Sequence, residues 1–210
     1  MEDETLTYYR DQVATLVWSG FFNRDDLDRY LDDLAYDEQA VPFIGEVRAH
    51  ALSEMDAKRA AEAGWPTQTD CDRLAAAFVR LEAGRVLPLH NAGYTTSDAH
   101  GDAWHIINTD GRDRWDGFCY YHGQDVERAI QGEPLFVGFE AVAEGVAQKT
   151  AIGERVAAAL RDAGFTVDWN GEPETRMSIT DLDWKKRTDW RSAPQNDPPR
   201  KGLLSRLFGL

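Results

Sequence analysis

The chain has 210 residues and a formal net charge of −14 at pH 7, with 42% hydrophobic and 11% aromatic residues. This length and composition suit one ordinary domain with an appended element, and they exclude a chain that is disordered throughout. The acidic excess lies in residues 1–180, whereas 181–210 contain seven basic and four acidic residues. Because phosphate contacts need a positive surface, we expect no nucleic-acid binding by the acidic part. The negative charge is compatible with a cationic binding partner, and it is also compatible with a surface charge that only maintains solubility.

The first residues, MEDETLTYYRDQ, are acidic and lack the apolar core of a signal peptide. No apolar run approaches the roughly 20 residues of a membrane-spanning helix. Cys71 and Cys119 are too few for a disulfide framework and look chemically inert. We therefore expect a cytoplasmic protein with reduced thiols and no transmembrane segment.

The N-terminal part has helical periodicity. Apolar residues recur at helical spacing through 4–20, and Gly20 ends the pattern. Asn23 is expected to cap a second helix, and 45–63 read as a third that ends at Gly64. These patterns predict a helical segment over residues 1–64 that packs on a following sheet domain.

From Trp65-Pro66 onward the pattern changes. Thr69 or Asp70 caps a fourth helix, and five short apolar or alternating segments then read as strands: 86–91, 118–123, 135–140, 166–170 and 176–180. Helical patterns between the first four imply parallel strands, whereas the turn NGEPE makes the last two an antiparallel hairpin. We predict an α/β (α+β) domain over 65–190, with a mixed five-stranded sheet, helical crossovers and a C-terminal hairpin.

The C-terminal residues 191–210 form a separate prediction. RSAPQNDPPRKG is rich in proline and polar residues and is typical of a linker. In LLSRLFGL the apolar residues share one helical face, so 203–210 predict a weak contact with a membrane surface or a partner.

Two motifs carry most of the chemical information. HNAGYTTSDAH (90–100) and YYHGQDVER (120–128) each stand where a predicted strand runs into a polar loop. If the two strands are parallel, both loops emerge at one edge of the sheet, where open α/β sheets bind ligands. Histidine titrates near neutrality, and a neighbouring carboxylate can orient it. We therefore predict His90, His122, Asp98 and Asp125 as catalytic residues and Asn91, Tyr94, Gln124 and Arg128 as ligand-binding residues.

Structural explanations exist for the same residues. Asp98 and Asp125 suit the first turns of helices, and a strand-end histidine is often held by hydrogen bonds. His90, His122 and Asp98, with His100 and His105, also contain the ligand types of a two-histidine, one-carboxylate metal site. Because no metal-binding spacing such as HExxH or CxxC is present, we predict no metal site. Dinucleotide, phosphate-loop and serine-hydrolase motifs are also missing from the sequence, so the cofactor stays unknown.

Several segments resemble the DUF6891 family of uncharacterised bacterial proteins. The resemblance covers roughly residues 8–190 and rests on VWSGFFNRDDL, WPTQTDCDRLAAAF, LHNAGYT with the following SD, FCYYHGQDVERA, and FTVDWNG, RMSI and DWKKR near the end. The resemblance implies one compact fold that holds both motifs, and it implies no activity. The residues between the motifs follow no family pattern, so His100 and His105 are not expected in the site.

Two hypotheses follow from the sequence. The first is a cytoplasmic protein that binds a small molecule or performs acid–base chemistry on it, at a polar site built from the HNAGYT and YHGQD loops. The second is a non-catalytic acidic protein that binds a cationic protein, as an immunity protein neutralises a toxin.

Overall fold

A computed structural model of the protein describes residues 2–191. Contacts within the chain divide it into two units. The first comprises the residues up to Thr69 together with the segment that begins at Lys185, and the second is Asp70–Trp184. Residues 65–69 and 185–191, which the sequence assigns to the sheet domain or the tail, thus belong with the N-terminal helices. The predicted linker and tail after Arg191 lie outside the described residues.

The first unit is helical, as predicted. It contains α1 (Glu2–Ser19), α2 (Arg24–Leu34), the short 3₁₀ helix η1 (Val41–Phe43) and α3 (Ile44–Ala63). Gly20 follows α1 with a φ of +77°, a conformation that favours glycine. The cap predicted at Asn23 is confirmed, because its Oδ1 accepts the backbone N–H of Asp26 at 3.0 Å.

A strap formed by residues 185–191 closes this helical unit. Thr188 donates its backbone N–H to Glu62 of α3 at 2.9 Å, and the indole N–H of Trp190 donates to the same carboxylate at 2.7 Å. Glu62 also lies 3.4 Å from the ammonium of Lys58, which is completely buried and donates to the Thr188 hydroxyl. One buried ionic cluster therefore ties the strap to α3.

The second unit has a five-stranded sheet. Its helices are α4 (Asp70–Ala83), α5 (Thr96–Asp110), α6 (Gly123–Ile130) and α7 (Val146–Asp162), with a 3₁₀ turn η2 (Arg112–Arg114). Its strands are β1 (Val86–Leu89), β2 (Gly117–Tyr120), β3 (Leu135–Ala141), β4 (Val167–Asp168) and β5 (Met177–Ile179), in the spatial order β1-β2-β3-β5-β4. The predicted mixed sheet with a C-terminal β4–β5 hairpin is confirmed.

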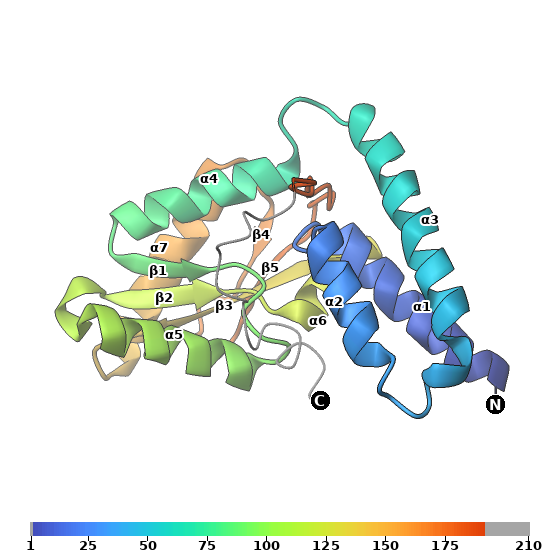
Figure 1. Ribbon diagram of the computed structural model, residues 1–210. Helices are drawn as coiled ribbons and strands as arrows, with labels where there is room; N and C mark the ends of the chain where they lie inside the picture. Colours follow the sequence, from blue (N-terminus) through green and yellow to red (C-terminus); the bar gives the residue numbers. More distant parts are fainter. Residues whose placement is uncertain (1, 192–210) are drawn as a thin grey trace. The chain divides into compact units, whose positions relative to one another are not determined.

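One part of the predicted topology is wrong. Only the β1–β2 pair is parallel in this sheet, and β3 runs antiparallel to β2. The reason lies in α6, which has eight residues and lies beyond the end of β2 instead of over a face of the sheet (Figure 1). A parallel connection must carry the chain back along the whole strand before it re-enters the sheet. Here the chain passes through the short helix α6 at the end of β2 and then runs back as β3.

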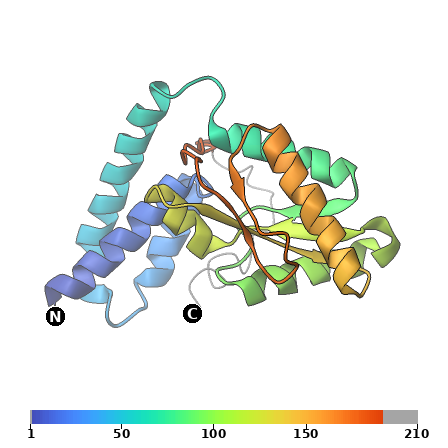
Figure 2. The ribbon, with the colours of Figure 1, turned by 180° about the vertical axis from the view of Figure 1, so that it is seen from behind.

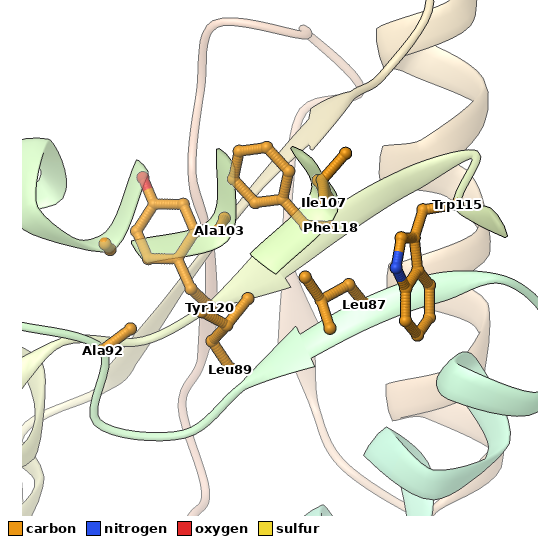
Figure 3. Close-up of a cluster of buried hydrophobic side chains, with 9 residues drawn as sticks. Leu87, Leu89, Ala92, Ala103, Ile107, Trp115, Phe118 and Tyr120 are labelled. Carbon is orange, nitrogen blue, oxygen red and sulfur yellow. The ribbon is translucent and has the colours of Figure 1, made fainter. Parts of the chain in front are cut away.

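Helices cover both faces of the sheet. In both ribbon views α4 and α7 lie side by side on one face and α5 lies on the other (Figures 1 and 2). Because side chains alternate along a strand, Leu87, Leu89, Phe118 and Tyr120 point towards α5, where they meet Ala99, Ala103 and Ile107 (Figure 3). This packing fixes α5, and hence the loop that precedes it, against β1 and β2. No helix within residues 2–191 is both long enough and apolar enough to cross a bilayer.

Candidate functional site

The two motif loops lie side by side at the carboxyl ends of β1 and β2. The backbone N–H of Ala92 donates to the Tyr121 carbonyl at 2.9 Å, and the Gly123 N–H donates to the Gly93 carbonyl at 3.0 Å. Gly93 has a φ of +58°, and a Cβ there would lie 2.2 Å from that of Asp98. Glycine is therefore required for the turn that brings the HNAGYT loop onto the YHGQD loop.

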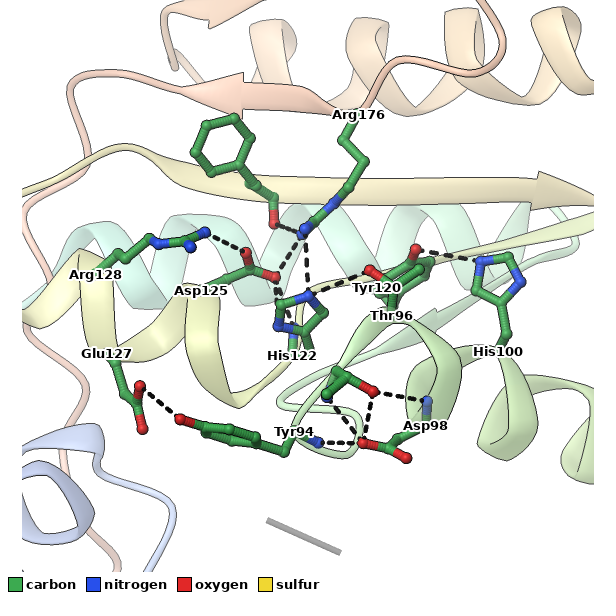
Figure 4. A network of polar contacts seen from close by, with 12 residues as sticks. Tyr94, Thr96, Asp98, His100, Tyr120, His122, Asp125, Glu127, Arg128 and Arg176 are labelled. Carbon is green, nitrogen blue, oxygen red and sulfur yellow. Dashed lines mark hydrogen bonds and ion pairs between the residues drawn. The ribbon is translucent and has the colours of Figure 1, made fainter. Parts of the chain in front are cut away.

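A buried ionic cluster lies under these loops. Asp125 is fully buried at the first turn of α6, and its Oδ2 accepts the backbone N–H of His122 at 3.0 Å. The same oxygen forms an ion pair with Arg176, which precedes β5 and also donates to the Phe136 carbonyl at 2.9 Å. The imidazole of His122 is 3% exposed and lies between these two charges (Figure 4).

The neighbours of His122 determine its protonation. Nδ1 lies 3.1 Å from Oδ2 of Asp125, and Nε2 lies 3.2 Å from Nη1 of Arg176. A guanidinium has only donors, so Nε2 must accept and the single ring proton resides on Nδ1. Burial, opposed by the charge of Asp125 and assisted by that of Arg176, lowers the pKa of His122. The His122 ring is therefore uncharged, and the lone pair of its Nε2 accepts from Arg176.

Acidification is expected to weaken the second unit. Burial also lowers the pKa of His100. As the pH falls below the ordinary histidine pKa of 6.5, both histidines therefore bind a proton more readily in the unfolded protein than in the folded protein. The free energy of unfolding should therefore be highest above pH 6.5 and fall as the pH drops towards the folded pKa values, by at most about 1.4 kcal/mol per pH unit for each histidine. Urea unfolding at several pH values measures this slope. It should be smaller in His122→Asn and smallest when His100→Asn is added; equal slopes in all three proteins would contradict the assignment.

Polar contacts continue from this cluster across the α5 face of the sheet. The hydroxyl of Thr96 lies 3.4 Å from Nε2 of His122. The Tyr120 hydroxyl lies 3.2 Å from Nε2 of His100 (Figure 4). The ring of Tyr120 crosses Gly138 of β3, where a Cβ would lie 2.3 Å from its Cζ atom. Burial raises the pKa of Tyr120, which keeps its hydroxyl protonated.

Beside His100 lies an open cleft of about 500 Å³. His100 and Trp104 of α5 line it together with Glu140 and the start of α7. The ammonium of Lys149 lies 3.0 Å from both Glu140 and Glu174, and the guanidinium of Arg112 lies 5.1 Å from the Trp104 ring centroid. The cleft therefore offers an aromatic wall, both signs of charge and one half-buried histidine.

The structure does not bring His90 and His122 together. Nδ1 of His90 lies 2.7 Å from the Tyr121 hydroxyl, and its ring lies 4.6 Å from that of Phe78 in α4. His122 instead neighbours Tyr120 and Thr96, on the α5 face. Successive strand residues point to opposite faces, so the expected pair of histidines is divided by the sheet.

The other predicted residues have mixed positions. Asp98 is the third residue of α5 and completes a capping box with the N-cap Thr95, whose side chain and backbone donate to the Asp98 carboxylate and lower its pKa. The Tyr94 hydroxyl donates to Glu127 at 3.1 Å, and Gln124 donates its backbone N–H to the Tyr94 carbonyl. Arg128 lies at the edge of the cluster, with Nη1 4.0 Å from Oδ1 of Asp125. Asn91 has a φ of +49°, and its buried Oδ1 has no hydrogen-bond partner within residues 2–191.

Four residues of the network were not predicted as site residues: Arg176, Thr96, Tyr120 and His100. Arg176 precedes β5 and lies 51 residues from Asp125 in the sequence, so no local pattern indicates that the two side chains pair. For His100 a pattern was available, because Ala99, Ala103 and Ile107 recur at intervals of four and predict a helix whose apolar stripe adjoins it.

Comparison with known proteins gives a family but no activity. The family model described as "Domain of unknown function (DUF6891)" matches residues 2–188, so the chain belongs to this family. Searches of the curated proteins and of the solved structures found no match. Residues 2–191 also contain no group of three or more His, Cys, Asp or Glu side chains placed to hold a metal ion.

Proposed function

We propose that this member of the DUF6891 family binds a small polar molecule in the cleft beside His100, and that it does so in the cytoplasm. The observation that carries the proposal is the cleft of about 500 Å³ whose wall holds His100, with Nε2 of its ring 3.2 Å from the buried Tyr120 hydroxyl. Buried polar groups that are linked in this way hold their side chains in one arrangement, which is what a binding site requires.

The cleft has the properties of a small-molecule site. It combines an aromatic side chain, Trp104, with a few charged groups that are able to orient a ligand. In this proposal the paired loops do not line the cleft; they support the start of α5, which carries His100 and Trp104. Asp125 and His122 hold Arg176, and Asp98 fixes the HNAGYT loop through its cap on α5.

The location in the cytoplasm rests on the two thiols. Cys71 and Cys119 are buried thiols that form no disulfide, and burial raises the pKa of the Cys119 thiol. Buried cysteines in the thiol state agree with a reducing compartment.

A ligand screen by thermal shift tests the binding proposal. Nucleotides, organic acids, amino acids and sugars would be added singly to wild type, His100→Ala and His105→Ala. His105 lies on the same helix but is exposed and outside the cleft, so it is the matched control. We expect a compound that stabilises wild type and the control, and binds His100→Ala about tenfold more weakly, a loss of about 1.4 kcal/mol.

Equal binding by all three proteins would place the ligand elsewhere and contradict the proposal. If no compound binds, and the protein instead captures a cationic protein with an affinity that decreases with salt, the immunity-type alternative is correct.

A further inference from the structure

We infer that the cleft beside His100 takes a small zwitterion, an amino acid with an apolar side chain, whose carboxylate pairs with Arg112 and whose ammonium group pairs with Glu144. This class of ligand rests on the proposed binding in the cleft. Besides His100, five ionisable side chains line the cleft. Three of them already form ion pairs with one another, and the other two have no ion-pair partner within residues 2–191.

Lys149 holds the paired set together. Its ammonium, near the start of α7, lies 3.0 Å from Glu140 of β3 and 3.0 Å from Glu174, which precedes β5. The side chain of Lys149 is 17% exposed and that of Glu140 is 25% exposed, so this contact is partly buried. A charged ligand group that bound one of these side chains would replace an ion pair that already exists, and its net gain would be small.

Arg112 is the first of the two remaining charges. Its guanidinium lies 5.1 Å from the centroid of the Trp104 ring, and no carboxylate within residues 2–191 pairs with it. Stacking on an aromatic ring fixes the plane of a guanidinium, while the N–H groups along its edge are able to donate two parallel hydrogen bonds to a carboxylate. Arg112 is therefore positioned at the cleft wall to receive a carboxylate.

Glu144 is the second remaining charge and lies in the loop between β3 and α7. No cation in the described part of the chain pairs with it. Three carboxylates and two cations line the cleft, so the excess of charge there is negative and disfavours a doubly charged phosphate. An ammonium group on the ligand would pair with Glu144 and offset this excess.

The rest of the cleft wall is apolar. Val142 and Trp104 pack against the core cluster beneath α5, and Val146 at the start of α7 is 71% exposed. An alkyl or aromatic group on the ligand would remove this apolar surface from water, which favours binding. One carboxylate, one ammonium and one apolar group together describe an amino acid.

Leucine and two analogues with a single charge test this class of ligand. Isocaproate lacks the ammonium group and isoamylamine lacks the carboxylate, but both keep the branched alkyl chain of leucine. Titration of the full chain at neutral pH, followed by the indole N–H resonance of Trp104 in NMR spectra, measures the Kd of each compound. We expect leucine to bind about tenfold more tightly than either analogue, because each charged group adds a hydrogen-bonded ion pair.

Substitutions assign the two charged contacts. Arg112→Gln should remove the advantage of leucine over isoamylamine, and Glu144→Gln should remove its advantage over isocaproate. Arg114→Gln and Glu154→Gln are the matched controls, since Arg114 lies in η2 and Glu154 in α7, both outside the cleft. Both controls should bind leucine as wild type does.

Equal affinities of wild type for leucine and either analogue, or equal losses in a cleft variant and its control, would overturn the amino-acid assignment. A nucleotide or a sugar that needs His100 for binding, in a protein that leucine does not bind, would overturn this assignment and leave the proposed binding site intact. If no compound moves the Trp104 resonance or depends on His100, the proposed function fails together with it.

Discussion

Replacing Arg176 with methionine is expected to lower the free energy of unfolding of the second unit by about 3–5 kcal/mol at pH 7.5. The substitution keeps most of the side-chain volume but removes the charge that pairs with Asp125, which is fully buried. A buried carboxylate without a cation has lost its interaction with water, and no ion pair offsets that cost. Urea unfolding, followed by amide hydrogen exchange in β2 and β5, measures the loss.

Arg128→Met is the matched control. Its guanidinium lies 4.0 Å from the same carboxylate, but its side chain is 48% exposed, so we expect a loss of at most about 1 kcal/mol. Adding Asp125→Asn to Arg176→Met should restore part of the stability, because the unpaired charge is then gone. Equal losses in the two arginine variants would contradict the buried ion pair.

The second large effect is expected in the first unit. Glu62→Ala should destabilise it by about 3–5 kcal/mol, because it removes the carboxylate that lies 3.4 Å from the fully buried ammonium of Lys58. It also removes the acceptor for the backbone of Thr188 and the indole of Trp190, so the strap should detach from α3. Hydrogen exchange in α3 and the fluorescence of Trp190, compared with a Trp190→Phe background, report these two consequences separately.

Glu46→Ala provides the comparison on the same helix. Glu46 pairs with Arg10 at 3.0 Å, but both side chains are largely exposed, so the loss should stay below about 1 kcal/mol. The double substitution Lys58→Met/Glu62→Leu removes both buried charges and should recover much of the stability lost in Glu62→Ala. An unchanged exchange rate in α3 of Glu62→Ala would show that the cluster does not hold the strap.

The sequence by itself determined the helices, the approximate strands and the meeting of the two motifs. Helical periodicity and caps are local properties, so Asn23 and the apolar face of α2 were enough to place that helix. The parallel alignment of β1 and β2 followed from the helix between them, and it brought HNAGYT beside YHGQD.

Only the tertiary structure decided the direction of β3, the separation of His90 from His122, and the identity of the polar network. A shift of one residue along a strand moves a side chain to the other face, so the end of β1 at Leu89 and of β2 at Tyr120 determines on which side each histidine lies. Arg176 lies 51 residues from Asp125 in the sequence, and a charge pair at such a distance leaves no periodic trace. The site depends on this pair because a buried carboxylate must find a cation wherever the fold places one.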